Sequence, residues 1–247
     1  MEENKFKLPT ETVELPSKGK LYPEGNALKE GKIEMKYMTA KEEDILTNQS
    51  YIQSGTVLDK LLQSLIVTKI SYDDLLIGDK NAIMIAARIL GYGKDYKFMY
   101  RGEEETVDLT KIENAPIHEE VQKATSNEFA FTLPGSGNVV TFKLLTHGDE
   151  KKIDDEIKGL KKINKDSASE VTVRLAHIIT SVNGSTDKKD IREFVNNYFL
   201  AKDARAFRSY YNEVSPDIDV KIVLTNSEGI EEDADLPIGI NFFWPDA

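Results

Sequence analysis

The chain has 247 residues and a net charge of −11, so a strong attraction to the phosphates of nucleic acid is not expected. It contains no cysteine, which excludes disulfide bonds, thiolate metal sites and a cysteine nucleophile. The hydrophobic share of 40% suffices for a packed core, and no apolar run approaches the length of a membrane span.

The first stretch of the chain predicts an arm, a loop, a strand and a helix start. Residues 1–12 are polar and acidic, unlike a signal peptide, so we expect a loose arm on a soluble, intracellular protein. Residues 16–32 are rich in proline and glycine and predict a loop. Residues 33–38 alternate apolar and charged side chains, as in a half-buried strand. Thr39 and Glu42 then form the pattern of a capping box.

Apolar residues at helical spacing predict further helices in the first half. One helix is expected over 57–66, after a break at 48–55. Another is expected to use Asp79 as its N-terminal cap and to end at Gly91–Gly93. Residues 95–109 have the pattern of a β-hairpin.

The second half predicts the same order of elements with longer helices. A strand-like run at 139–144 leads to a second capping signal at Thr146, and a last hairpin is expected over 218–235. The expected helices cover 153–163, 171–182 and 191–211, the last being either continuous or restarted.

Short matches recur in the same order in both halves, which predicts an internal duplication. The matched pairs are 13–19 with 131–137, 33–38 with 139–144, 79–83 with 187–191, 95–100 with 219–224, and 108–109 with 235–236. We therefore expect an α+β fold of two related units, each with a short strand segment, a helical cluster and a hairpin. The predicted divisions are an arm at 1–12, a first unit at 13–118, a linker at 119–130 and a second unit at 131–247.

Candidate catalytic groups are few and have ordinary structural explanations. His118, His147 and His177 lack the one-turn spacing of a zinc-binding histidine pair. Asp73–Asp74 and Asp79 could be a magnesium site, but carboxylates beside helix starts more often interact with free amides. We expect no catalytic residue, no cofactor and no bound metal.

Two apolar features are candidates for partner contact. The Lys18–Pro23 segment is present in the first unit and missing from the second, and its Leu21 and Tyr22 would contact either a partner or their own domain. The aromatic C-terminal segment is either a core plug or a partner anchor. The candidate partner-binding residues are Leu21, Tyr22, Pro23, Phe242, Phe243 and Trp244.

Five segments together resemble a known family. They are Leu15–Pro23, Met38–Leu46, Leu75–Asp79, Arg88–Tyr96 and Leu236–Pro245. In their order and spacing they resemble the T-even-type phage baseplate protein family, the tail-hub proteins of contractile-tailed phages. Some members carry a cysteine pair in the first hairpin, whereas this chain has Tyr100-Arg101-Gly102 there, so a zinc role of that pair does not carry over.

The resemblance implies a non-enzymatic structural protein, a baseplate hub subunit that acts through protein–protein contacts in tail assembly. It implies partners among the other baseplate and tail-hub proteins, and a location in the host cytoplasm during assembly and then in the virion tail. We expect no nucleic-acid, membrane or small-molecule partner. One alternative is a hub assembly chaperone absent from the mature virion. Another, of a different class, is a metal-dependent hydrolase in an unfamiliar fold, built around Asp73, Asp74, Asp79 or His118.

Overall fold

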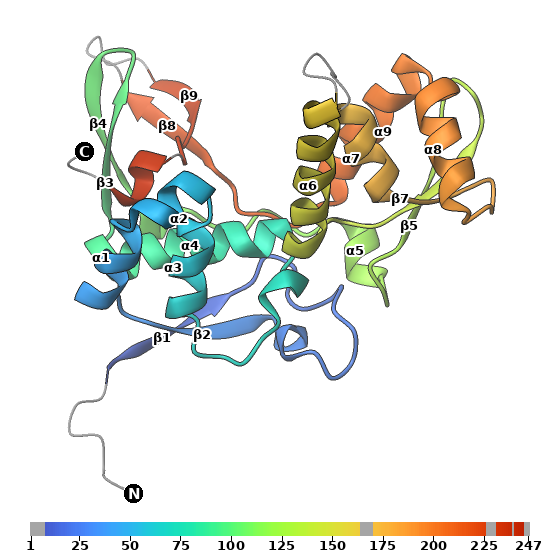
Figure 1. The fold of residues 1–247 in the computed structure, drawn as a ribbon. Coiled ribbons are helices and arrows are strands. Elements are labelled where there is room, and N and C mark those ends of the chain that lie inside the picture. The colour runs from blue at the N-terminus through green and yellow to red at the C-terminus, as the bar shows by residue number, and fades with distance from the viewer. Residues whose placement is uncertain (1–7, 164–169, 226–230, 239, 245–247) are drawn as a thin grey trace, which may run out of the picture.

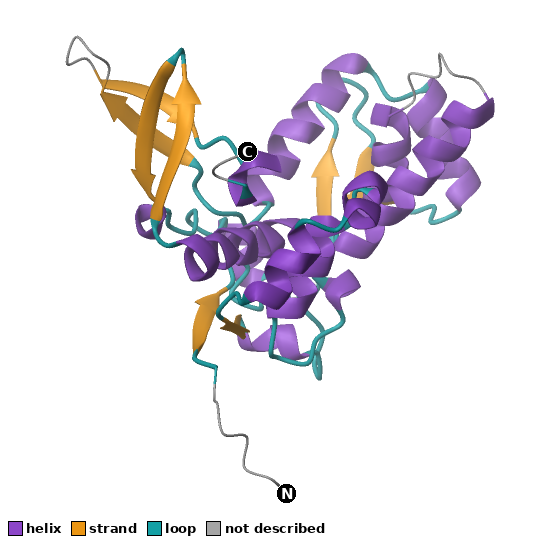
Figure 2. Cartoon of the chain, turned by 60° about the vertical axis from the view of Figure 1, so that its left-hand side comes forward, coloured by secondary structure: helices purple, strands orange, loops and turns teal. Residues whose placement is uncertain are grey.

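The computed structural model describes residues 8–163, 170–225, 231–238 and 240–244. These residues form an α+β fold of helices and small antiparallel sheets, as the sequence predicts. Figures 1 and 2 show two lobes that diverge from the long central helix α4 (Ile77–Tyr92). None of the helices described is long and apolar enough to cross a membrane.

The first lobe combines the start of the chain with its end (Figure 1). Beside α4 it contains β1 (Thr10–Glu14), β2 (Lys32–Lys36), α1 (Ala40–Leu46), α2 (Gln49–Ser54), α3 (Val57–Leu65), β3 (Asp95–Tyr100), β4 (Glu103–Asp108), β8 (Lys221–Thr225) and β9 (Glu231–Asp235). Short 3-10 turns lie at Ala27–Glu30, Tyr72–Asp74, Leu109–Lys111 and Ile240–Phe243.

The second lobe is a three-stranded sheet, in the order β5-β6-β7, with helices around it (Figure 1). It contains α5 (Glu119–Lys123), β5 (Phe129–Thr132), β6 (Val139–Phe142), α6 (His147–Ile163), α7 (Glu170–Ile178), β7 (Ile179–Val182), α8 (Lys188–Asn197) and α9 (Ala201–Val214). The restarted form of the predicted third helix is therefore the correct one.

Both predicted capping signals begin helices that follow strands. Thr39 precedes α1, and its N–H and hydroxyl both donate to Glu42 Oε2, at 3.0 and 2.6 Å. Thr146 precedes α6, and its hydroxyl accepts the N–H of Asp149 at 3.3 Å. The carboxylates thus satisfy amides that have no partner inside the helix.

The expected break at 48–55 is wrong, because residues 49–54 form α2. The side chain of Asn48 accepts the N–H groups of Ser50 and Tyr51, and Gly55 ends the helix at a φ of 70°. Asparagine and glycine suit a loop, but they suit the two ends of a one-turn helix equally well.

The expected helix over 171–182 is wrong in its last four residues, which form β7. Val140 pairs with Val182 and Thr141 with Ser181, so β7 completes the sheet beside β6. Residues 178–182 are rich in β-branched side chains, which favour a strand once a sheet edge is available. Helical spacing alone could not reveal that edge.

The predicted N-terminal arm is too long. Residues 10–12 belong to β1, where Thr10 pairs with Lys36 and Val13 with Ile33 in an antiparallel ladder. Residues 1–7 of the predicted arm lie outside the described part of the chain.

The C-terminal segment packs on the first lobe. Arg88 Nε donates to the carbonyl of Phe242 at 2.9 Å, and the Tyr96 hydroxyl donates to that of Pro237 at 3.0 Å. The Phe242 and Phe243 side chains are fully buried. The division into lobes therefore does not follow the predicted boundaries at 118 and 131, since residues after 217 return to the first lobe.

Each half has a strand pair, helices and then a hairpin, although in the second half the strand β7 lies between the helices. An ion pair occupies the same place in each half, because Lys36 bonds Glu42 at 2.8 Å and Lys143 bonds Asp149 at 2.7 Å. In both halves the lysine precedes the capping threonine by three residues and the carboxylate follows it by three. This equivalence supports the duplication, which stays a prediction.

Substitution of Thr39 by alanine should lower the free energy of unfolding by about 0.5–2 kcal/mol, because the capping box loses its hydroxyl. Thr47→Ala is a matched control at the other end of α1, where the exposed hydroxyl donates to the Glu43 and Asp44 carbonyls of its own helix. Urea unfolding of both variants measures the difference. Equal midpoints for Thr39→Ala and the wild type would contradict the capping role.

Candidate functional site

A buried carboxylate joins the Leu15–Pro23 segment to the start of α4. Asp79 accepts the Ser17 N–H at 2.9 Å, the Ser17 hydroxyl at 2.7 Å and the Tyr22 hydroxyl at 2.6 Å. The Tyr22 oxygen in turn accepts the Leu76 N–H at 2.9 Å. Burial raises the pKa of the Asp79 carboxyl, and these donors oppose that shift. We call this network the first anchor.

The expectation that Asp79 caps its helix is wrong. The cap position of α4 is Leu76, and Asp79 lies in the first turn with its side chain directed to the Ser17–Tyr22 loop. Spacing along the sequence placed a carboxylate near a helix start correctly, but it could not show that a loop 57 residues away supplies the donor.

A second anchor occupies the corresponding place in the second lobe. Asp203, also fully buried, accepts the N–H groups of Gly135 and Ser136, the latter at 3.0 Å. It lies three residues after Leu200, the cap residue of α9, as Asp79 lies three residues after Leu76. In the predicted duplication, Asp79 therefore corresponds to Asp203 and not to Asp187.

Of the two alternatives for Leu21 and Tyr22, the structure shows contact with their own domain, so neither is available to a partner as expected. Each side chain is 4% exposed, because the loop folds back onto its own lobe and Tyr22 enters the first anchor. Pro23 is exposed, Phe242 and Phe243 are core residues, and Trp244 is partly buried against the core. Among the six candidate partner-binding residues, the aromatic side chains thus serve mainly internal packing.

A short backbone seam joins the two lobes. The Ile77 N–H donates to the Leu145 carbonyl at 3.3 Å, and the His147 N–H donates to the Leu75 carbonyl at 2.7 Å. Ile77 and His147 are the first residues of α4 and α6. The chain just before each helix therefore supplies the acceptor for the first amide of the other helix. A Cβ at Gly78 would lie 1.8 Å from the Pro216 carbonyl oxygen, so this close approach requires glycine.

A polar cluster lies beside the seam and includes one of the sequence-predicted histidines. Lys80 Nζ contacts Asp59 Oδ1 at 2.6 Å and His147 Nδ1 at 3.2 Å, and the Tyr72 hydroxyl donates to Asp59 at 3.1 Å. Burial, followed by the charge of Lys80, lowers the pKa of His147. A neutral imidazole that accepts from Lys80 fits this arrangement.

The described residues contain no group of three or more histidine or carboxylate side chains placed to hold a metal ion. Asp74 bonds the Asn26 side chain, Asp79 faces Ser17, and Asp73 lies near Gly148, so the proposed magnesium ligands point apart. The other two histidines each have a partner within the second lobe. His118 accepts the Glu120 N–H at 3.3 Å, and His177 contacts Glu156 at 2.9 Å.

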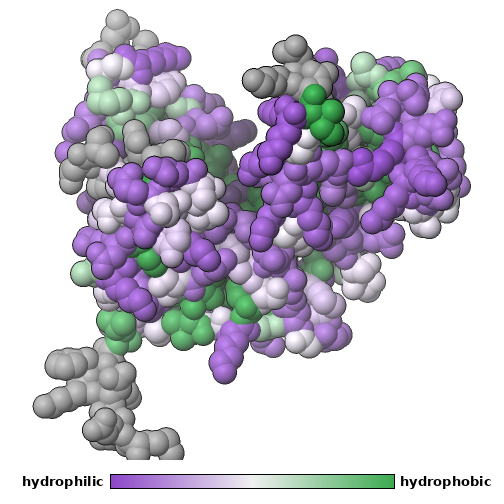
Figure 3. Space-filling model, in the orientation of Figure 1, coloured by the Kyte–Doolittle hydropathy of each residue, from purple (hydrophilic) through white to green (hydrophobic). Residues whose placement is uncertain are grey.

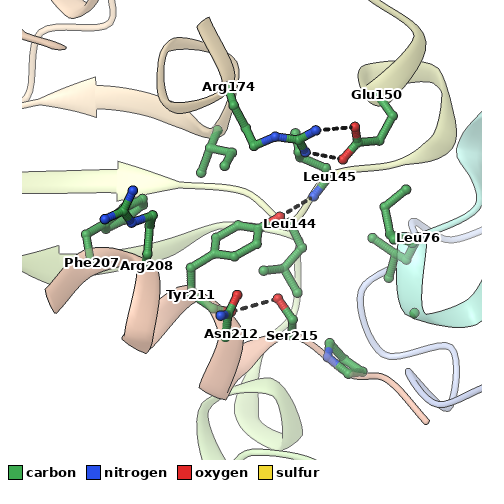
Figure 4. Close-up of a pocket in the computed structure, with 14 residues that line it drawn as sticks. Leu76, Leu144, Leu145, Glu150, Arg174, Phe207, Arg208, Tyr211, Asn212 and Ser215 are labelled. Atoms are coloured by element: carbon green, nitrogen blue, oxygen red, sulfur yellow. Dashed lines mark hydrogen bonds and ion pairs between the residues drawn. The ribbon is translucent and has the colours of Figure 1, made fainter. Parts of the chain in front are cut away.

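A cleft of about 280 Å³ opens where the seam meets α9, and sequence reasoning did not predict it. Figure 4 shows leucine and aromatic side chains around it, with two arginines at its margin. In Figure 3 the surface is mostly hydrophilic, and hydrophobic residues are visible in the hollow between the lobes. The apolar wall includes Leu76, Leu144, Leu145, Ile178, Phe207 and Pro216.

Most polar groups of the cleft are already engaged. Arg174 forms a bidentate ion pair with Glu150, and the Tyr211 hydroxyl accepts the Leu145 N–H at 3.0 Å. Burial raises the pKa of Tyr211 to about 12. Arg208 has no hydrogen bond or ion pair to any described residue, so the margin of the cleft carries one uncompensated positive charge. These lining groups suit binding of an apolar, acidic segment better than they suit catalysis.

Comparison with protein-family models, with curated proteins and with solved structures found no match to this chain. The candidate sites therefore stand on the geometry alone. That geometry consists of two anchors, one seam and one cleft at the junction of the lobes.

Replacing Tyr22 by phenylalanine should destabilise the protein by about 1–3 kcal/mol, because it leaves the Leu76 N–H without an acceptor and removes a donor from buried Asp79. Tyr37→Phe is the control, since the Tyr37 hydroxyl bonds Glu11 at an exposed position and its loss should leave the unfolding midpoint close to that of the wild type. Thermal or urea unfolding compares the two. A Tyr22→Phe variant as stable as Tyr37→Phe would contradict the anchor.

Glu42 should contribute to acid sensitivity. Burial acts to raise its pKa, but hydrogen bonds from Lys36, Ser64 and Thr39 outweigh burial and hold the pKa at about 2. Since the folded pKa lies below the ordinary value of 4.5, the stabilisation is present above about pH 4.5 and is lost as the pH falls toward 2.

Glu42→Gln should therefore be less stable than the wild type at pH 7 and should lose less stability between pH 5 and pH 2. Unfolding in urea at several pH values measures this slope. Glu43→Gln is the control on the same helix, because Glu43 is exposed. If the slopes of Glu42→Gln and the wild type are the same, the ion pair does not set the acid response.

Proposed function

We propose that the chain is a non-enzymatic structural protein of a phage tail baseplate, a hub subunit that acts through protein–protein contacts. Its partners would be other baseplate and tail-hub proteins. It would act in the host cytoplasm during assembly and remain in the tail afterwards. This proposal rests on the resemblance of five segments to the T-even-type baseplate family.

The observation that carries the proposal is that these five segments meet in space. Leu15–Pro23 contacts Leu75–Asp79 through the first anchor. Arg88–Tyr96 holds Leu236–Pro245 through two hydrogen bonds to carbonyl groups. Met38–Leu46 begins with the capping box, and its Met38 side chain packs against Gly91.

Segments that are far apart in sequence and that resemble one family thus build one continuous core. These contacts place apolar residues of the segments that carry the resemblance in the core. The contacts therefore support a shared fold as the origin of the resemblance, and they explain the motif residues through packing and hydrogen bonding rather than through catalysis.

The cleft at the junction of the lobes is the candidate surface for a partner. Its apolar wall and the unpaired Arg208 suit a protein segment that carries an apolar side chain beside a carboxylate. In a chain of net charge −11, an arginine at this margin that forms no ion pair with a described residue is a local feature rather than part of a general positive field.

Inactivation of the gene in its phage should give lysates without complete baseplates when tails are viewed by electron microscopy, and a plasmid copy should restore them. Mass spectrometry of purified virions then separates the two assembly roles. Presence of the chain supports a hub subunit, whereas absence with failed assembly supports the chaperone. Normal infectious tails without the gene would refute both.

The same complementation assay tests the cleft. Arg208→Glu should reduce the yield of tails, because it reverses the charge at the margin. Arg205→Glu, three residues earlier on α9 and outside the cleft, is the matched control and should complement normally. Equal yields from both variants would remove the cleft, but not the chain, from the assembly role.

A further inference from the structure

The two anchors differ in what covers them. In the first lobe, residues 20–31 fold over the start of α4 and bury Leu21, Tyr22 and Leu28, while Leu76 is 4% exposed. In the second lobe, strand β6 begins two residues after Gly137, so no equivalent cover exists. The corresponding Leu200 is 50% exposed.

The equivalence of the two places rests on backbone geometry as well as on order. Leu76 and Leu200 have φ/ψ values of −62°/148° and −59°/143°, and each caps its helix without a side-chain hydrogen bond. In each loop a glycine follows two residues after the first amide that the carboxylate holds. These glycines, Gly19 and Gly137, have φ values of 73° and 74°. Each loop therefore has a left-handed glycine at this position, although Lys18 has a φ of 49° and the corresponding Ser136 has no positive φ.

The uncovered place has both exposed apolar surface and a backbone N–H without an acceptor among the described residues. Tyr198, two residues before Leu200, is 60% exposed. The loop from Pro134 to Gly137 is also exposed, whereas Pro16, Ser17 and Gly19 of the corresponding loop in the first lobe are buried. The Leu76 N–H is taken by the Tyr22 hydroxyl, whereas the Leu200 N–H has no acceptor within the part of the chain that the structure describes. We call Pro134–Gly137, Tyr198 and Leu200 the open anchor face.

We infer that the open anchor face is a docking surface for a loop of a partner protein that presents an apolar side chain next to a hydrogen-bond acceptor, such as a leucine followed by a tyrosine. The first lobe shows the chemistry of the occupant, because its own Leu21 and Tyr22 cover the equivalent place. A second copy of the chain is a poor occupant, since its loop is already buried in its own first anchor. Tyrosine is enriched among the residues that dominate binding energy at protein interfaces.

This inference rests on the proposed role in protein–protein contact and adds a second surface to it. The fully buried Asp203 holds two backbone amides, so the incoming acceptor would reach the Leu200 N–H rather than the carboxylate. The partner would therefore add contacts to the second anchor without opening it.

A synthetic peptide with the sequence of residues 17–31 is the probe, because it copies the cover of the first lobe. Titrated into the full chain and followed by amide NMR shifts, it should bind saturably and shift residues 134–137 and 198–200. Leu200→Asp should weaken binding at least about tenfold. Val171→Asp, with a similarly exposed residue on α7, is the control and should not change it. A peptide with serine in place of both Leu21 and Tyr22 should not bind.

Absence of saturable binding to the wild type, or equal binding to Leu200→Asp, would overturn the inference. Analytical ultracentrifugation gives a third outcome that would overturn the inference. If the wild type dimerises with increasing concentration and Leu200→Asp does not, a second copy of the chain is the occupant. Circular dichroism of Leu200→Asp checks that it is folded. If gene inactivation blocks baseplate formation but the peptide does not bind, the docking role of the open anchor face is refuted and the proposed function is not.

Discussion

The carboxylate of Asp79 is the interaction on which the arrangement of the first lobe depends. It is fully buried, and its hydrogen-bond donors are all neutral groups from one loop, the Ser17 amide and hydroxyl and the Tyr22 hydroxyl. A buried charge is tolerated only where hydrogen bonds replace the lost water. The loop must therefore keep its turn, because any other conformation would leave the carboxylate without donors. The proline and glycine residues around it limit the alternatives.

The first anchor also holds the start of α4, next to the seam between the lobes. Tyr22 holds the Leu76 amide, Leu76 opens α4, and the residues on either side of Leu76 make the backbone seam with Leu145 and His147. One hydroxyl thus links the inserted loop to the junction of the lobes. The cleft lies against the same seam, since Leu76 and Leu145 belong to its wall. The anchor and the candidate partner surface are therefore connected by two steps of direct contact.

Features that depend on neighbours in the sequence were predictable, whereas those that depend on distant partners were not. The capping boxes at Thr39 and Thr146 follow from spacings of three residues, and the hairpin at β3 and β4 follows from alternation around a glycine turn. The strand β7 was missed because its preference is decided by the open edge of β6. The role of Asp79 was missed because its donors are supplied by tertiary contact. The cleft was missed because its wall combines residues near 76, 144, 178 and 207, which only the folded chain brings together.

The two anchors show that a loop can be held by its buried carboxylate without the covering residues that the first lobe adds. Asp203 holds its loop through the backbone amides of Gly135 and Ser136 and the Ser136 side chain, so a buried carboxylate at this place does not require a tyrosine. The extra residues in the first lobe, which bring Tyr22, bury apolar surface that the second lobe leaves in contact with solvent. Because burial of a leucine and its capping amide is favourable, the surface around Leu200 gains stability from any partner that supplies the same groups. The surface around Leu200 and the wall of the cleft are then the two apolar surfaces proposed for recognition, since the aromatic C-terminus and the Leu21–Tyr22 loop are buried in the core.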